Sequence, residues 1–403
     1  MRFKGNPRTY SLLSVASLVS SGPVIAANIP AIAEIFPKIS ITHVSLLTTI
    51  PSLFVIPGVL IGNRLEQVIG KKVTILAGLG LFLVAGTFPA FYHELFSLLF
   101  VSRCLLGLGI GLFNRLIIQM ISDRHRENPS KQAAMIGLES AFEGLGGICL
   151  TLLVGQLLPL GWYIPFCIYG LALPIFIAFL SFVPSDRKGL SKSREPQFTT
   201  VSRSIPDKKS LQVLIVFGLF LFLIVMIFIH YNIQITLLLL EQKIGNATTG
   251  SNMLAFLGLG AFIAGFSFGK IYKILGHYTI ACGITLLGGA MWVTTVSQSI
   301  FLTTFCSMVI GFSFRCIMPY LLHIFTRQSE EIAKLGTTIV LISYNLGAAL
   351  SPYEGSLIKE MFHIENVRDS VLVNAMILMI VSIGGFGLTT YYHKGLHEQK
   401  TND

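Results

Sequence analysis

Long apolar stretches separated by short polar breaks run along almost the whole chain. Each stretch is close to the roughly 20 residues that an α-helix needs to cross the hydrocarbon core of a bilayer. The pattern therefore predicts an all-α integral membrane protein with twelve transmembrane helices. We place them at residues 10–35, 43–63, 73–92, 95–121, 133–157, 162–183, 211–235, 249–269, 278–298, 300–325, 335–357 and 370–392.

The composition points to the same class of protein. Of the 403 residues, 53% are hydrophobic and only 12% are charged, whereas an ordinary soluble domain has about 25% charged residues. All six cysteines fall inside predicted helices without metal-ligand spacing, so we interpret them as small core residues. No P-loop, zinc motif or nucleophile elbow occurs, so we expect neither a metal nor another cofactor, and no enzymatic activity.

Basic residues are distributed unevenly between the two sides of the predicted membrane. If the amino terminus is cytoplasmic, twenty-two of the 29 lysines and arginines lie on the cytoplasmic side and four lie outside. This asymmetry follows the positive-inside rule and predicts that both termini are cytoplasmic. Basic loops beside anionic lipids also account for the net charge of +10, so no nucleic-acid partner is expected. We expect a multi-pass protein of a bacterial plasma membrane.

A hydrophilic segment after the sixth predicted helix divides the chain into two halves. We expect four regions: an N-terminal six-helix bundle at 1–183, a basic cytoplasmic linker at 184–210, a C-terminal six-helix bundle at 211–393 and a cytoplasmic tail at 394–403. The motif IGLFNR at 110–115 matches IGFSFR at 310–315, an offset of 200 residues. Glycines of the fifth and eleventh helices keep this offset, which indicates that the two bundles are pseudo-symmetric.

A glycine-bounded motif follows the second predicted helix. It has two glycines, an acid between them and two basic residues after them: Gly62, Glu66, Gly70, Lys71 and Lys72. A second copy after the eighth helix keeps the glycines at Gly269 and Gly276 but has Lys273 in the acidic position. In this motif the chain resembles the major facilitator superfamily. It departs from the family's pattern by one extra residue between the first two glycines and by glutamate in place of the usual aspartate.

Three helices carry further parts of the resemblance. The fourth helix has the closest match, an arginine followed by a glycine-rich face: Arg103, Gly107, Gly109 and Gly111. The antiporter signature of the fifth helix is mostly missing, because Thr151 and Leu152 stand where a Gly-Pro pair is expected. The eleventh helix is closer to the expected form, with Ser351, Pro352 and Gly355. The resemblance implies a rocker-switch secondary transporter, in which two bundles tilt about a central site.

Charged side chains inside membrane spans cost about 2.5–3.5 kcal/mol each and are functional candidates by default. Glu139 and Glu143 are four residues apart and therefore share one face of the fifth helix. Arg115 and Glu139 are equally far from the turn between the fourth and fifth helices, which predicts an Arg115–Glu139 ion pair at one depth. Glu143 then has no basic partner and could take up a proton. We predict Glu143 first, and Glu139 second, as proton-coupling groups.

Other candidates have competing interpretations. By resemblance, Arg103 takes part in proton coupling or organises the helices near it. Alternatively, Arg103 snorkels toward the outer face, because it lies only about eight residues inside its helix. Arg115 and Arg315 occupy matching positions in the two halves and could grip an anionic substrate. Asn28 is a further candidate substrate contact, because prolines on both sides of it interrupt the first helix, as in a helix that lines a cavity.

These features favour proton-coupled efflux of a small amphipathic compound or drug by antiport. The main alternative is transport of a small organic anion gripped by Arg115 and Arg315, and a remote alternative is an integral membrane enzyme or sensor. The expected partners are a small-molecule substrate, protons and the lipid bilayer, and the protein is expected to be a monomer. His230, Asn232 and Gln234 near the end of the seventh helix are interpreted as polar caps at the outer interface, with substrate contact as the second interpretation.

Overall fold

The structure is a computed structural model that describes residues 7–124, 129–184, 208–326 and 330–402. Over these residues the chain contains helices and no strands, as predicted. Within these ranges, ten helices are long and apolar enough to cross a membrane, and the number of spans is eleven if the bent pair at the start of the chain counts as one span. The chain is therefore a multi-pass membrane protein, while the number of twelve spans stays a prediction.

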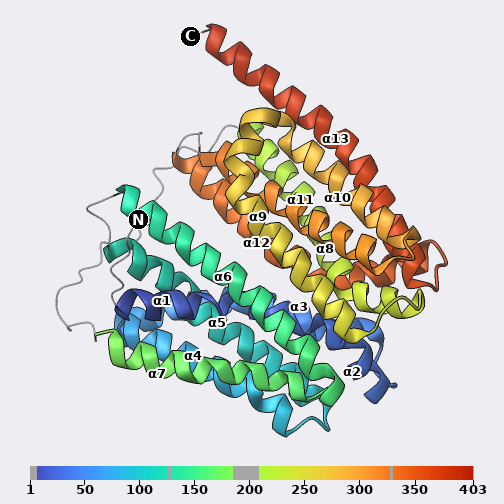
Figure 1. The fold of residues 1–403 in the computed structure, drawn as a ribbon. Helices are drawn as coiled ribbons and strands as arrows, with labels where there is room; N and C mark the ends of the chain where they lie inside the picture. Colours follow the sequence, from blue (N-terminus) through green and yellow to red (C-terminus); the bar gives the residue numbers. More distant parts are fainter. Residues whose placement is uncertain (1–6, 125–128, 185–207, 327–329, 403) are drawn as a thin grey trace. The chain divides into compact units, whose positions relative to one another are not determined.

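The chain divides into two compact units, which we call unit 1 (Met1–Ile205) and unit 2 (Pro206–Asp403). Most of the predicted linker, residues 185–207, lies outside the described residues. The helices of unit 1 are α1 (Pro7–Ala16), η1 (Val19–Asn28), α2 (Ile29–Ile35), α3 (Ile41–Ile69), α4 (Lys71–Phe91), α5 (Phe96–Arg124), α6 (Pro129–Leu157), η2 (Leu158–Leu160), η3 (Ile164–Leu171) and α7 (Ala172–Phe182). Those of unit 2 are α8 (Lys208–Glu241), α9 (Ala247–Leu275), η4 (Gly276–Tyr278), α10 (Thr279–Val296), α11 (Ile300–Thr326), α12 (Glu330–Met361) and α13 (Val367–Asn402), all labelled in Figure 1 except the short η segments.

The first predicted helix is broken, as its prolines indicate. It bends by 41° between α1 and the segment Val19–Ile35, and η1 has 3₁₀ geometry with Pro23 inside it. Proline has no N–H to continue an α-helical ladder, and Ser17 Oγ donates to the Ser14 carbonyl at 2.6 Å just before the bend. Unit 1 thus has irregular backbone within its first span.

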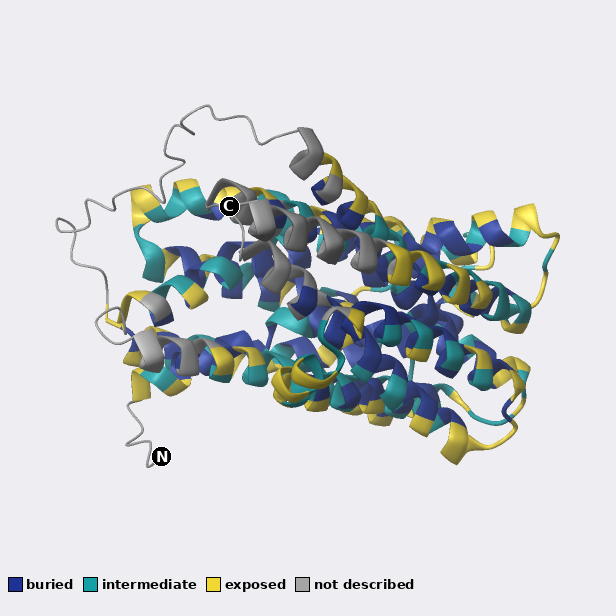
Figure 2. Cartoon of the chain, turned by 90° about the horizontal axis from the view of Figure 1, so that it is seen from above, coloured by how far each residue is buried: buried dark blue, intermediate teal, exposed yellow. Residues whose placement is uncertain are grey.

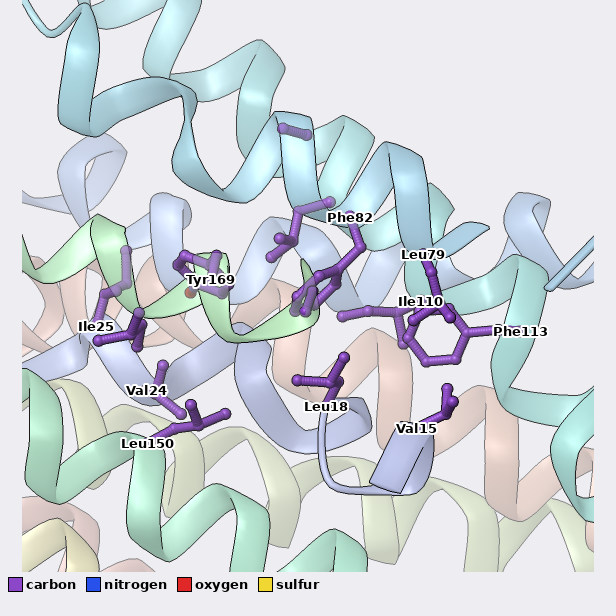
Figure 3. Packing of buried hydrophobic residues seen from close by; sticks show 14 of the residues in the cluster. Val15, Leu18, Val24, Ile25, Leu79, Phe82, Ile110, Phe113, Leu150 and Tyr169 are labelled. Atoms are coloured by element: carbon purple, nitrogen blue, oxygen red, sulfur yellow. The ribbon is translucent and has the colours of Figure 1, made fainter. Parts of the chain in front are cut away.

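Each unit buries its own apolar core and exposes other apolar side chains. In unit 1, the core joins η1, α4, α5, α6 and η3, and Figure 3 shows Ile25, Phe82, Phe113, Leu150 and Tyr169 packed within it. The outer faces carry many large exposed hydrophobic side chains, and Figure 2 shows exposed positions along most helices. A soluble monomer rarely exposes so much contiguous apolar surface, so these faces are suited to contact with lipid.

The glycines after Arg103 bring α5 close to two neighbouring helices. A Cβ on Gly109 would lie 2.9 Å from the backbone nitrogen of Phe82 on α4, and a Cβ on Gly111 would lie 2.7 Å from the Cα of Gly58 on α3. These distances leave no room for a side chain, so the glycines permit the close packing that membrane helices favour.

Unit 2 repeats this packing at the predicted offset of 200 residues. A Cβ on Gly311 of α11 would lie 2.7 Å from the carbonyl carbon of Leu257 on α9, and one on Gly260 would lie 2.8 Å from that of Met308. The glycine of IGLFNR and the glycine of IGFSFR therefore play the same part, each closing a contact between two helices of its own unit.

Candidate functional site

Arg103 lies on α5 with only 1% of its surface exposed. Its Nε donates a hydrogen bond to the Leu47 carbonyl of α3 at 3.0 Å. Its Nη2 donates to the Gly22 carbonyl of η1 at 2.8 Å and to the Tyr169 hydroxyl of η3 at 2.9 Å. The guanidinium carbon is also 5.1 Å from the centroid of the Tyr169 ring. Arg103 therefore does not snorkel: it joins four elements inside unit 1.

Neutral groups surround this buried charge. Tyr169 accepts from Arg103 and donates its own hydroxyl hydrogen to the Ser21 carbonyl at 3.1 Å. Among the described residues no carboxylate forms an ion pair with Arg103, and its Nη1 has no hydrogen-bond partner. A buried charge must be hydrogen-bonded to be tolerated, and here backbone carbonyls and a phenol supply the bonds. This geometry supports the role of organising helices, while proton coupling by Arg103 stays a prediction.

Arg115 does not pair with Glu139, and that prediction was wrong. Its Nη2 lies 3.3 Å from Oε1 of Glu66 on α3 and 3.4 Å from Oε1 of Gln119. The equal depth of Arg115 and Glu139 was an argument about position along the helix axis only. The side of α5 that carries Arg115 faces α3 instead, because the glycine contacts hold α3 and α5 together.

The loop motif between α3 and α4 is a set of contacts within unit 1. Gly70 ends α3 and precedes α4 with φ of 84°, a left-handed conformation that favours glycine. Lys71 Nζ forms an ion pair with Asp123 near the end of α5 at 2.7 Å. Lys72 Nζ donates to the Leu180 carbonyl of α7 at 2.8 Å. With the Glu66–Arg115 pair, the motif connects α3 and α4 to the same end of α5.

Gly62 completes this motif by close packing rather than by a polar bond. A Cβ on Gly62 would lie 3.3 Å from the Leu112 carbonyl oxygen of α5. This contact is looser than those of Gly109 and Gly111. Gly62 lies about one helical turn before Glu66 on the same helix. This spacing places Glu66 on the side of α3 that faces α5.

The second copy of the motif has no such ion pair among the described residues. A Cβ on Gly269 would have no atom within 4 Å, and Gly276 ends α9 with φ of 53°. Lys273 stands where unit 1 has Glu66, and Arg315 stands where unit 1 has Arg115. Both side chains are exposed, and no ion pair involves either of them among the described residues. Unit 2 thus has two basic residues where unit 1 has an ion pair.

Glu139 and Glu143 lie on α6 near the irregular segment η1. Glu139 is 2% exposed; its Oε2 accepts from the Ser140 hydroxyl at 3.5 Å, and its Oε1 has no partner. Glu143 Oε1 accepts a hydrogen bond from the Ser20 hydroxyl of η1 at 2.7 Å. No basic side chain forms an ion pair with either acid among the described residues. Within the described part of the chain, the two predicted proton-coupling groups are therefore acids whose side-chain partners are serine hydroxyls.

Asn28 is completely buried at the end of η1. Its Nδ2 donates to the Trp162 carbonyl at 2.5 Å, and its Oδ1 has no hydrogen-bond partner. The amide therefore ties η1 to the turn before η3, and one acceptor remains unused. Substrate contact by Asn28 stays a prediction.

Unit 2 contains a buried pair that the sequence did not indicate. His230 on α8 is 1% exposed, and its Nδ1 lies 3.5 Å from Oε2 of Glu354 on α12. The interpretation of His230 as a polar cap at the outer interface was therefore wrong. The predicted signature residue Pro352 lies two positions before Glu354, and Ser351 Oγ donates to the Ala348 carbonyl at 2.9 Å. In a regular α-helix the Ala348 carbonyl would accept from the backbone N–H four residues later, but Pro352 stands there and has no N–H.

The signal in the sequence that could have pointed to this pair is Glu354 itself, an acid between the signature residues Pro352 and Gly355. The sequence separation of more than a hundred residues between α8 and α12 hides which helices meet. Among the described residues, no group of three or more histidine, cysteine, aspartate and glutamate side chains could hold a metal ion.

Comparison with known proteins identifies the class of molecule. The family model described as Major Facilitator Superfamily matches residues 10–352, most of the chain. A search of curated proteins finds no match.

Three solved structures illustrate the similarity in fold. The nucleoside transporter NupG is 12% identical, with a TM-score of 0.73 over 96% of this chain and 99% of that one.

The other two are also transporters. A bacterial homolog of the human lysosomal transporter Spinster, in an inward-facing and unoccupied conformation, is 14% identical, with a TM-score of 0.73 over 97% of this chain and 98% of that one. The peptide transporter POT in complex with sulfate is 13% identical, with a TM-score of 0.71 over 97% and 96%. At these identities the comparison shows a shared fold and leaves substrate and coupling ion open.

Proposed function

The chain belongs to the major facilitator superfamily, and we propose that it is a secondary active transporter that exports a small amphipathic compound in exchange for protons. In this proposal twelve spans form two six-helix bundles, 1–183 and 211–393, joined by the cytoplasmic linker at 184–210. The bundles tilt alternately to open a central site to either side of a bacterial plasma membrane. Both termini are cytoplasmic, and the protein acts as a monomer without a cofactor.

The observation that carries proton coupling is the acidic face of α6. Glu139 and Glu143 are four residues apart on an apolar helix, and neither has a basic partner among the described residues. Two neighbouring carboxylates on one face of an apolar helix, with Glu139 buried, are least costly when one of them holds a proton. A site of this kind binds a proton when it faces the acidic side of the membrane and can release it on the other side.

The contact between Glu143 and Ser20 links the charge of the Glu143 carboxylate to other contacts in unit 1. Ser20 is the one residue of η1 with non-helical dihedral angles, φ of −84° and ψ of 19°. The same segment supplies the Gly22 and Ser21 carbonyls that bind the Arg103–Tyr169 pair. We therefore assign η1 as the element that responds when Glu143 gains or loses its proton, because their 2.7 Å bond depends on the charge of the carboxylate.

Transport of a small organic anion is the second candidate, and one observation favours it. Arg315 is exposed on α11, and no ion pair involves it among the described residues, whereas Arg115 is bonded to Glu66. An arginine without an internal carboxylate can bind a carboxylate or phosphate of a substrate. In this form of the proposal Arg315 is the main anion contact, and Arg115 takes part only if its bond to Glu66 opens.

The proposal is tested with the full-length protein in proteoliposomes under an imposed pH gradient. Uptake of three probes is compared: ethidium as an amphipathic cation, uridine as a nucleoside and dialanine as a small peptide. A transported probe should accumulate when the gradient is imposed and should lose this accumulation when a protonophore is added. No gradient-driven flux of any probe, together with gradient-independent exchange, would contradict proton coupling.

The role of the acidic face is tested with Glu143→Gln on the probe that is transported. We expect gradient-driven accumulation to fall at least tenfold while exchange of the probe across the membrane continues. Glu94→Gln is the matched control, because Glu94 is an exposed acid between α4 and α5. Full accumulation by Glu143→Gln would remove this carboxylate from the coupling mechanism.

A further inference from the structure

Three buried polar side chains from different helices meet in unit 2. His230 comes from α8, Glu354 from α12 and Asn374 from α13, and they are 1%, 8% and 0% exposed. The helices α12 and α13 both pack against α8. His230 Nδ1 is 3.5 Å from Glu354 Oε2. Asn374 lies close to the Glu354 carboxylate, so one acid is enclosed by an imidazole and an amide.

These side chains leave an unusual number of polar atoms without hydrogen bonds. By hydrogen-bond distance and angle, neither carboxylate oxygen of Glu354 and neither polar atom of the Asn374 amide has a partner, although the amide is near enough to the carboxylate to interact with it. Nε2 of His230 is also without a partner. Native proteins satisfy nearly all buried polar atoms, so a group of unsatisfied atoms at one place calls for a ligand or a proton that completes them.

The helix contact is shaped around the imidazole. A Cβ on Gly355 would lie 2.5 Å from Nδ1 and 3.0 Å from Nε2 of His230, so only glycine leaves room for the ring against α12. Gly355 directly follows Glu354, and the close approach therefore brings the ring to the acid. This geometry is a built site, because its parts come from three helices, of which α8 is separated from α12 and α13 by three other long helices.

No other charge on the surrounding helices neutralises Glu354 among the described residues. Lys359 on α12 donates to the Glu365 carbonyl at 3.3 Å. Glu241 at the end of α8 accepts from the backbone nitrogens of Val367 and Arg368 at the start of α13. These charges, with Asp369 in the first turn of α13, lie at the helix ends.

An ionised Glu354 beside a neutral imidazole would leave a net negative charge inside the unit, which apolar surroundings disfavour. We infer that the His230–Glu354 pair is a second proton-binding site, separate from the acidic face of α6, and that it holds one proton at neutral pH. The proton is bound to the Glu354 carboxyl beside the His230 ring, and its release to water leaves the carboxylate ionised. Both groups are neutral while the proton is bound.

Infrared spectroscopy of the full-length protein in detergent tests this inference without a substrate. The C=O stretch of a protonated carboxyl is distinct from the bands of an ionised carboxylate. The difference between wild type and Glu354→Gln at pH 6 should contain the band of one protonated carboxyl. Glu360→Gln is the matched control, since Glu360 is an exposed acid on the same helix, and it should leave this band unchanged.

Two further measurements address misfolding of Glu354→Gln and binding of sodium in place of the proton. If Glu354→Gln does not fold, Glu354→Asp should shift the band, and raising the pH should remove it from the wild type. Absence of a protonated-carboxyl band from wild type at pH 6 would overturn the inference, and so would a band that no Glu354 substitution removes or shifts, because the acids of α6 would then account for it. Loss of the band on replacing choline chloride by sodium chloride at constant pH would also overturn it, because the site would then bind sodium in preference to a proton. Since no transport is measured, failure here is distinguishable from failure of the proposed function.

Discussion

The ion pair between Arg115 and Glu66 allows a quantitative test of the helix arrangement in unit 1. The two charged atoms are 3.3 Å apart, and the side chains are 33% and 11% exposed. Coulomb attraction of two unit charges at this separation is about 5 kcal/mol at an effective dielectric constant of 20. Desolvation and side-chain ordering offset much of this energy. Exposed pairs are worth about 0.2–1 kcal/mol, and breaking a buried pair costs about 3–5 kcal/mol.

Partial burial places the Arg115–Glu66 pair between these limits. We expect a coupling energy of roughly 1–2 kcal/mol in a double-mutant cycle of Glu66→Gln and Arg115→Gln. For a unit of about 200 residues, this corresponds to roughly 2–8 °C in the thermal midpoint. The assay is thermal unfolding of each purified full-length variant in one detergent, at low and at high salt. Salt should reduce the coupling, because the arginine is partly open to solvent.

A second cycle serves as the control. Glu139→Gln combined with Arg115→Gln should be additive within about 0.5 kcal/mol, because Glu139 does not contact Arg115. Coupling in the Glu139 cycle with none in the Glu66 cycle would refute the arrangement of α5 against α3. It would instead restore the hairpin pairing that the sequence predicts.

Three further predictions concern other contacts. Gly111→Val should prevent recovery of folded protein or lower its thermal midpoint strongly, since the new side chain would overlap α3, whereas Gly265→Ala should be tolerated because no atom lies within 4 Å of the added Cβ; equal midpoints would contradict the close packing. Tyr169→Phe removes a hydroxyl that both accepts and donates inside unit 1, and we expect a loss of about 1–3 kcal/mol in thermal or denaturant unfolding, with an unchanged stability counting against the bond. Gly355→Ala should displace the His230 ring and change the chemical shifts of its imidazole nitrogens in NMR of labelled protein; an unaltered histidine spectrum would contradict the described contact.

The apolar pattern predicted the helices well, because the bilayer sets the length of each span. The first helix was even predicted to be interrupted, since proline cannot continue the ladder of hydrogen bonds. The glycines after Arg103 were correctly related to close helix packing, although the partners of each glycine came only from the structure.

The partners of charged residues were not predictable in the same way. Counting residues from a turn gives the depth of Arg115, but each residue also turns the helix by about 100°, so the facing helix is undetermined. The burial of Arg103 depends on η1 and η3, which each supply a hydrogen-bond acceptor to it. No periodic pattern in the sequence predicts that these two segments pack near α5. The His230–Glu354 pair joins helices separated by more than a hundred residues, and nothing local to either residue indicates the other.

The hydrogen bonds of Arg103 have a consequence for how unit 1 tolerates mutation. Two of its three acceptors are peptide oxygens, those of Leu47 and Gly22, and every amino acid supplies such an oxygen. Substitutions at those two positions can therefore leave the acceptors of the guanidinium in place. The hydrogen bonds of Arg103 depend on the position of the main chain. A displacement of either segment by a fraction of an ångström would therefore change these bonds, whatever side chains the segment carried.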